Sequence, residues 1–129
     1  MVDIDYIMSL LDWNKSATDQ AAGIKMPEKI ENINVFVQPC NKNYNKNVWD
    51  NCAKILFKRT DEELSPYLIE LLTWLQDLNW PGALCVFDRL QKYEDKVSYS
   101  RALDTCLKYA KAVKDNVWES NLRMLQVHN

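Results

Sequence analysis

Apolar residues recur at intervals of three and four along most of the chain, which is the spacing of one face of an α-helix. Similar spacing appears in residues 48–56, 102–113 and 118–125. The pattern predicts an all-α protein of about six or seven helices, with short connections that favour antiparallel neighbours. In the strongest stretch, from Pro66 to Leu78, one arc holds Leu68, Leu71, Leu72, Leu75 and Leu78.

The N-terminal part predicts helices over residues 3–32 and a less regular segment after them. Ser16 and Asp19 form a capping-box pattern that starts the second of these helices. Pro27 cannot continue a helical hydrogen-bond ladder, so we expect a kink or a fresh start there. Residues 33–46 join a short apolar and polar alternation to a polar run dense in asparagine, which predicts an extended linker and a loop.

Further signals place the helix ends in the second half of the chain. Thr60 and Glu63 form another capping-box pattern. Ser65 and Pro66 have the residue types of an N-cap followed by proline at the first helical position. These signals predict that a helix begins just before the leucine-rich stretch.

A repeated tetrad suggests that the helices come in pairs. Residues 47–50 read Asn-Val-Trp-Asp, residues 116–119 read Asn-Val-Trp-Glu, and Asn79 and Trp80 lie between them. The intervals, 79 minus 47 or 32 residues and 116 minus 79 or 37 residues, fall within the range of helical solenoid repeats. With asparagine as N-cap, residues 47–129 would form helical repeats. The alternative is coincidence in a chain with 5 tryptophans.

Composition favours one helical domain over residues 1–129. A chain of 129 residues with 47% hydrophobic and 26% charged residues resembles an ordinary globular domain. It has only 2 glycines and 4 prolines, too few for the many turns of a β-sandwich or barrel. The net charge of -2 provides no strong basic field, so nucleic acid is not an expected partner.

The cysteines and the single histidine predict no metal site and no cofactor. Cys40, Cys52, Cys85 and Cys106 are scattered without a paired spacing, and His128 is remote from them in sequence. Three of the thiols fall in apolar helical stretches, where they behave as small hydrophobic residues in a reducing compartment. Neither a signal peptide nor an 18-residue apolar run is present, so we expect a cytoplasmic protein without membrane contact.

The leading candidate for a binding site is the helix that carries Trp74. On a continuous helix, Trp74 falls at the edge of the leucine arc beside Glu70 and Asp77, where an indole and two carboxylates offer a stacking surface. The alternative is a half-buried tryptophan with solvated acids beside it. Glu70 and Asp77, two turns apart on that helix, have the residue types of an acid and base pair, but no histidine, phosphate cradle or metal triad supports catalysis. We therefore predict no enzymatic activity.

The residues that follow complete the candidate site. Gln76, Asn79 and Trp80 are binding candidates with Trp74, although their side chains also suit the capping of helix ends at a corner. A second candidate surface is the stripe of Lys108, Lys111 and Lys114, for which a solvated helix face is the alternative.

Three segments resemble a bacterial family of unknown function. They are residues 11–14, Leu-Asp-Trp-Asn, residues 36–39, Phe-Val-Gln-Pro, and residues 74–83, Trp-Leu-Gln-Asp-Leu-Asn-Trp-Pro-Gly-Ala. The last contains the W-L-Q-D-x-N-W-P segment that marks the family. The resemblance runs from about Leu10 to Leu90. It implies antiparallel helix pairs stacked as a short HEAT-like superhelix, and no established activity.

These observations predict a non-enzymatic protein-interaction module with an unidentified protein partner. An immunity-type inhibitor that blocks a bacterial toxin is one form suggested by analogy with helical-repeat families. The alternative is a helical-repeat protein that acts on nucleic acid or binds a small ligand.

Overall fold

The computed structural model describes residues 3–39 and 44–128, with side chains up to Leu125, and within these ranges all regular structure is helical. The all-α prediction is confirmed. The α-helices are α1 (Ile4–Leu10), α2 (Ala17–Lys25), α3 (Trp49–Phe57), α4 (Asp61–Leu64), α5 (Leu68–Thr73), α6 (Ala83–Gln91), α7 (Lys96–Ala112) and α8 (Asn116–His128). Short 3₁₀ segments join them: η1 (Met26–Lys29), η2 (Asn34–Phe36), η3 (Lys46–Val48), η4 (Ser65–Tyr67) and η5 (Trp74–Gln76). None of the helices in the described ranges is long and apolar enough to span a membrane.

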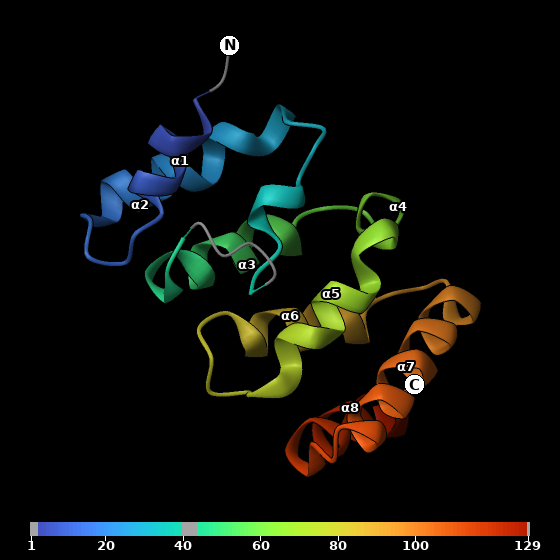
Figure 1. Ribbon diagram of the computed structural model, residues 1–129. Helices are drawn as coiled ribbons and strands as arrows, with labels where there is room; N and C mark the ends of the chain where they lie inside the picture. Colours follow the sequence, from blue (N-terminus) through green and yellow to red (C-terminus); the bar gives the residue numbers. More distant parts are fainter. Residues whose placement is uncertain (1–2, 40–43, 129) are drawn as a thin grey trace.

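The helices from α3 onward lie in two rows. In one row α3 packs against α6 and α6 against α8, and in the other α5 packs against α7 (Figure 1). The last two helices, α7 and α8, pack against each other, while α1 and α2 form a pair that contacts α3 through α2. Apart from the short α4, successive helices from α3 onward therefore alternate between the two rows.

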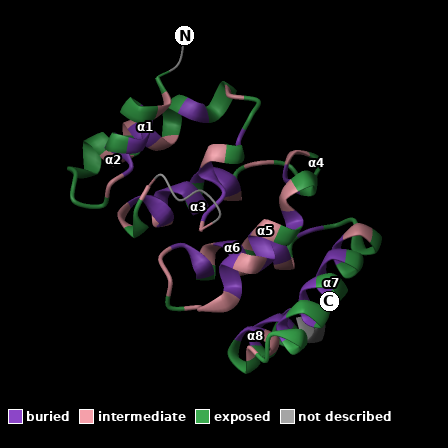
Figure 2. Ribbon diagram, viewed as in Figure 1, coloured by how far each residue is buried: buried purple, intermediate pink, exposed green. Residues whose placement is uncertain are grey.

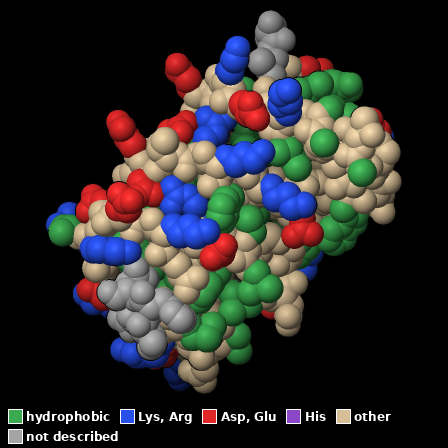
Figure 3. All heavy atoms as spheres, turned by 180° about the vertical axis from the view of Figure 1, so that it is seen from behind, with side chains coloured by type: hydrophobic (Ala, Val, Ile, Leu, Met, Phe, Trp, Pro, Cys, Tyr) green, Lys and Arg blue, Asp and Glu red, His purple; other side chains and the backbone are tan. Residues whose placement is uncertain are grey.

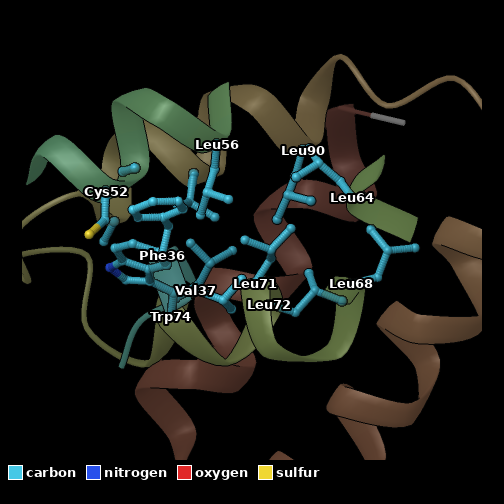
Figure 4. Close-up of a cluster of buried hydrophobic side chains, with 14 of the residues drawn as sticks. Phe36, Val37, Cys52, Leu56, Leu64, Leu68, Leu71, Leu72, Trp74 and Leu90 are labelled. Carbon is cyan, nitrogen blue, oxygen red and sulfur yellow. The ribbon is translucent and has the colours of Figure 1, made fainter. Parts of the chain in front are cut away.

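Buried apolar side chains form one continuous cluster along the molecule. Burial is heaviest in the central helices α3, α5 and α6, whereas α2 and α7 turn one face to solvent (Figure 2). In the centre of the cluster, Phe36 and Trp74 lie close together beside α3, and leucines of α5 point toward Leu90 of α6 (Figure 4). This core holds the two rows together by the burial of apolar surface.

Two of the predicted helix starts are confirmed. The Ser16 side chain accepts a hydrogen bond from the Asp19 N–H at 3.1 Å, at the start of α2. Thr60 and Glu63 form the reciprocal capping box of α4. The Ser65 prediction is wrong, because Ser65 ends α4 and starts η4, and its side chain caps no helix. The expected break at Pro27 is present, since Pro27 lies in η1 directly after α2.

The asparagines of the tryptophan repeat, Asn47, Asn79 and Asn116, do not act as N-caps. Asn45 caps η3 and Asp115 lies at the start of α8, whereas Asp77 follows η5 and closes a turn, and the N-cap of α6 is Gly82. Asn45 accepts from the N–H of residue 47 at 2.9 Å, and Asp77 accepts from that of residue 79 at 2.8 Å. Asp115 accepts from the N–H of residue 118 at 2.9 Å. Two of these bonds span two residues and the third spans three, so the three corners are similar without being identical.

Residues 33–38 are part of the core and do not form an extended linker. Ile33, Phe36, Val37 and Gln38 are all buried, and η2 packs against α3. The alternation of apolar and polar residues predicted an extended segment, but apolar residues at positions 33, 36 and 37 also have the spacing of a single helical turn. Residues 40–43 of the predicted loop lie outside the described residues.

Candidate functional site

The Trp74 side chain is fully buried, so the prediction of an accessible binding residue at this position is wrong. Its Nε1–H donates to the Pro81 carbonyl at 2.9 Å. The indole lies beside Phe36 in the interior, with Cys52 of α3 close by (Figure 4). A tryptophan whose ring is covered and whose N–H is bonded internally stabilises the fold and has no surface left for a ligand.

The cause of this burial is a change of helix geometry at Trp74. α5 ends at Thr73, residues 74–76 tighten into η5, and Asp77 adopts an extended conformation with φ -141° and ψ 110°. The predicted continuous helix to Leu78 is therefore wrong. Glu70 and Asp77 consequently do not share one helical face, which removes the geometry on which an acid and base pair would depend.

Asp77 organises the turn that follows. Its Oδ1 accepts from the Asn79 N–H at 2.8 Å, and its carbonyl accepts from the Trp80 N–H at 3.0 Å. The alternative role, a helix corner, therefore describes Asp77 better than ligand binding does. Of the other candidates, Asn79 is exposed, while Glu70 and Gln76 are half-buried.

Gly82 closes the same corner against α3. Its φ of 81° lies in the left-handed region that favours glycine, and its N–H donates to Asp50 Oδ1 at 2.6 Å. A Cβ at this position would lie 2.8 Å from the Trp49 carbonyl oxygen and 2.8 Å from the Trp74 ring. Gly82, at the end of the segment that begins at Trp74, therefore packs against α3 so closely that a side chain has no room.

Trp80 is the one tryptophan of the motif that is partly exposed. Its ring meets the edge of Trp49, with centroids 5.6 Å apart. Lys46 Nζ lies 5.8 Å from each of these two ring centroids, within the range of a cation–π interaction. Trp80 is therefore already engaged with groups of this chain.

A polar corner links α3, α4 and α6. Arg89 donates to Asp61 Oδ1 at 2.6 Å and to the Arg59 carbonyl at 2.9 Å. Arg59 in turn pairs with Glu63 at 2.8 Å. A hollow of about 290 Å³ lies against this corner, and Arg59 and Glu63 line it. Because Arg59 and Glu63 form a salt bridge with each other, the charges that they place at the hollow are already paired within the fold.

The carboxylates of this corner make stability depend on pH. Burial alone would raise the pKa of Asp61, but the Glu94 N–H and the Arg89 guanidinium outweigh it and hold that pKa below its ordinary 3.8. The Thr60 N–H and then Arg59 lower the pKa of Glu63. Each of these carboxylates has a lower pKa in the folded protein than in the unfolded chain. The stabilisation that it contributes is therefore complete above the unfolded pKa and is lost as the pH falls through the folded pKa.

Asp61→Asn is therefore expected to make the free energy of unfolding less dependent on pH below about 3.8, because it removes one carboxylate that takes up a proton on unfolding. Urea unfolding at a series of pH values measures this dependence. Asp104→Asn, which changes an exposed aspartate of α7, is the matched control. Equal pH slopes for Asp61→Asn and the unchanged protein would contradict the assignment.

The described cysteines are free thiols with raised pKa values. Burial raises the pKa of Cys106 to about 11 and that of Cys52 further. Burial also raises the pKa of Cys85, and the charge of Asp88 adds to this effect. Because the thiolate is the nucleophilic form, thiols with raised pKa values are poor nucleophiles at neutral pH. No group of three or more metal-ligating side chains occurs among the described residues.

A surface groove lies between η4–α5 and α7, and the sequence did not point to it. We call it the α5–α7 groove; its volume is about 400 Å³. Its apolar lining includes Pro66, Leu68, Ile69 and Ala102, with Arg101 and Thr105 on the α7 side. Ile69 is 41% exposed although it is adjacent to the leucine arc. An isoleucine just outside a continuous apolar arc was the signal that could have found this groove.

Tyr109 extends the apolar surface along α7. It follows Thr105 by four residues and Ala102 by seven, so the three side chains lie on one side of the helix. The Tyr109 ring is 60% exposed and meets the edge of Trp118 with centroids 5.9 Å apart. An exposed aromatic ring therefore lies beyond the α7 wall of the groove, on the same side of that helix.

The lysine stripe is shorter than predicted. Lys108 and Lys111 are exposed on α7, whereas Lys114 lies beyond its end with a φ of 60°. Across the face of the molecule opposite to the view of Figure 1, lysine and arginine side chains are interspersed with acidic ones (Figure 3). That face therefore presents charges of both signs.

The protein is an all-helical domain, and its most distinctive motif, the segment from Trp74 to Gly82, forms a structural corner of the fold. The chain belongs to the family described as Domain of unknown function (DUF5071), whose model matches residues 45–128. The match begins at the residue that caps η3 and includes the whole Trp74 corner. It extends to the end of α8, beyond the limit near Leu90 that the resemblance suggested, and it does not include residues 11–14 and 36–39, two of the three segments on which the resemblance was based. No curated protein and no solved structure matches the chain.

Proposed function

We propose that this chain is a non-enzymatic protein-interaction module that binds its partner along the α5–α7 groove. The observation that carries the proposal is the exposure of Ile69 in the α5–α7 groove, with the exposed Tyr109 ring one turn beyond Thr105 on the same side of α7. Exposed apolar side chains that gather in one place are typical of interaction sites, and tyrosine is enriched among the residues that dominate binding.

The arrangement of the helices suits such a role. α5 and α7 pack against each other and lie side by side, in the row next to that of α3, α6 and α8 (Figure 1). Stacked pairs of HEAT-like geometry form a short superhelix, and proteins of this kind bind partners across the surface formed by neighbouring repeats. The α5–α7 groove lies between two such neighbouring helices.

A protein partner fits the charges better than nucleic acid does. The net charge is -2, and the groove itself is lined by one cationic side chain, Arg101. Binding to a phosphate backbone depends on many cations along one surface. A cytoplasmic inhibitor that covers a bacterial toxin, as an immunity protein does, is the form of interaction module that we favour.

Ile69→Lys is expected to weaken partner binding at least tenfold, because it places a charge in the apolar floor of the groove. The tagged protein is used to capture partners from a lysate of its source organism, and bound proteins are quantified by mass spectrometry. Leu84→Lys is the control, since Leu84 is 65% exposed on α6, outside the groove. Both variants should unfold at nearly the same temperature as the unchanged protein.

The proposal requires a partner that the unchanged protein and Leu84→Lys retain and that Ile69→Lys loses. A partner that all three proteins retain equally would show that the groove is not the binding surface. Captured nucleic acid, released steeply by salt, would support the alternative function instead.

A further inference from the structure

The two hydroxyl groups on the α7 wall of the α5–α7 groove, those of Ser98 and Thr105, are already bonded at or within α7. Ser98 Oγ donates to Asp95 Oδ2 at 2.9 Å, and Thr105 Oγ donates to the Arg101 carbonyl at 3.0 Å. Each hydroxyl has one hydrogen to donate, and these bonds use it. The donors that remain for a ligand on this wall are therefore those of the Arg101 guanidinium.

Arg101 differs from the other arginines of the chain. Arg59, Arg89 and Arg123 each form a salt bridge, with Glu63, Asp61 and Glu119 at 2.8, 2.6 and 2.7 Å respectively. Arg101 is exposed and forms no salt bridge with any residue in the described ranges.

The charge of Arg101 acts at longer range on Asp95, whose side chain already accepts hydrogen bonds at the start of α7. Asp95 accepts from the Ser98 N–H at 3.2 Å as well as from the Ser98 hydroxyl. The guanidinium of Arg101 is thus available to a second carboxylate at the edge of the groove.

An apolar floor adjoins this charge. Ala102 follows Arg101 directly on α7, and Pro66 and Ile69 face it from the other side of the groove. An apolar side chain that covers this floor removes Ile69 from water, which favours binding. One cation beside one apolar floor selects a ligand with both an anionic and an apolar group.

We infer that the α5–α7 groove binds a peptide segment of the partner that carries an aspartate or glutamate next to a large apolar side chain. The carboxylate pairs with Arg101, whose planar fork of N–H groups matches two carboxylate oxygens, and the apolar side chain covers Ile69 and Ala102. This inference rests on the proposed function and adds the chemistry of the segment that is bound.

The test uses random twelve-residue peptides displayed on phage and selected on the full-length protein. We expect the selected peptides to share an acidic residue beside a large apolar one. A synthetic selected peptide should bind Arg101→Gln at least tenfold more weakly than the unchanged protein, by fluorescence polarisation. Arg123→Gln, which changes an exposed arginine of α8, should leave its affinity unchanged.

A peptide in which the acid is replaced by its amide separates the charge effect from other effects of the substitution. This peptide should bind the unchanged protein and Arg101→Gln equally, because the pair is already broken. An unequal loss would overturn the assignment of the carboxylate to Arg101, and so would selected peptides without an acidic residue or no selected peptide at all. The proposed function fails separately, when a captured partner is insensitive to Ile69→Lys.

Discussion

Gly82→Ala is expected to lower the free energy of unfolding by about 2–6 kcal/mol, as the sum of two effects of 1–3 kcal/mol each. The first is the strain of a side chain at a φ of 81°. The second is overpacking, because the new methyl group would lie 2.8 Å from a backbone oxygen of Trp49 and from the Trp74 ring, and 2.9 Å from Ala53 Cβ. The backbone oxygen and the buried ring have little freedom to move away.

Urea unfolding followed by far-UV circular dichroism measures this loss, with the slope against urea checked for a change in the cooperative unit. Leu84→Ala is the matched control on the same helix, α6, since its side chain is 65% exposed and its loss should change stability by at most about 0.5 kcal/mol. A loss below about 1 kcal/mol for Gly82→Ala would show that the corner relaxes around the added methyl group, against the packing described here.

The same corner shows how far the sequence predicts this fold. The Ser16 and Thr60 caps use local hydrogen bonds between residues three apart, so their residue types suffice to predict them. The leucine arc likewise follows from the periodicity of α5. What the sequence does not show is the tightening of the helix at Trp74, because the contacts that stabilise it come from residues distant in the chain.

Trp74 was placed at the edge of the helix by extending the α-helical rotation of 100° per residue past Thr73. The 3₁₀ turn and the extended Asp77 change that rotation and direct the indole into the core beside Phe36. Pro81 and Gly82 were the available signal, because this dipeptide marks a turn. The sequence thus identifies the right segment, whereas its role depends on packing against α3.

The groove was missed for a related reason. Ile69 lies just outside the leucine arc, which indicates that this apolar side chain can be exposed. The arc alone does not show that η4–α5 and α7 leave a groove beside it, because that depends on how the two segments pack. Arg101 gave no signal either, since an unpaired arginine is recognised only when the positions of all the described carboxylates are known.

These findings divide the molecule into a framework and a surface. The tryptophan motif fixes α6 against α3 and η5, through the Trp74 bond to Pro81 and the bond between the Gly82 N–H and Asp50. η5 follows α5 directly and packs against α6 and α8, so the α5 wall of the groove is continuous with an element that the corner holds in place. Changes in the corner should therefore act on stability first, and on partner binding only through stability.

Trp74→Ala provides the strongest test of this division, and it is expected to lower the free energy of unfolding by about 3–5 kcal/mol. The substitution empties a fully buried site and leaves the Pro81 carbonyl without its hydrogen-bond donor. Because a domain of this size typically has a total stability of about 5–15 kcal/mol, a substantial part would be lost. Urea unfolding gives the value directly.

Trp74→Phe separates framework from binding, because it keeps an aromatic ring in the core and removes the Nε1–H donor to Pro81. We expect it to lower stability by about 1–3 kcal/mol, the penalty of an unsatisfied buried acceptor, and to leave a folded protein. This variant should bind the captured partner with the affinity of the unchanged protein. If instead Trp74→Phe abolished binding while its unfolding curve stayed unchanged, Trp74 would be a binding residue, and the framework role argued here from its burial would be wrong.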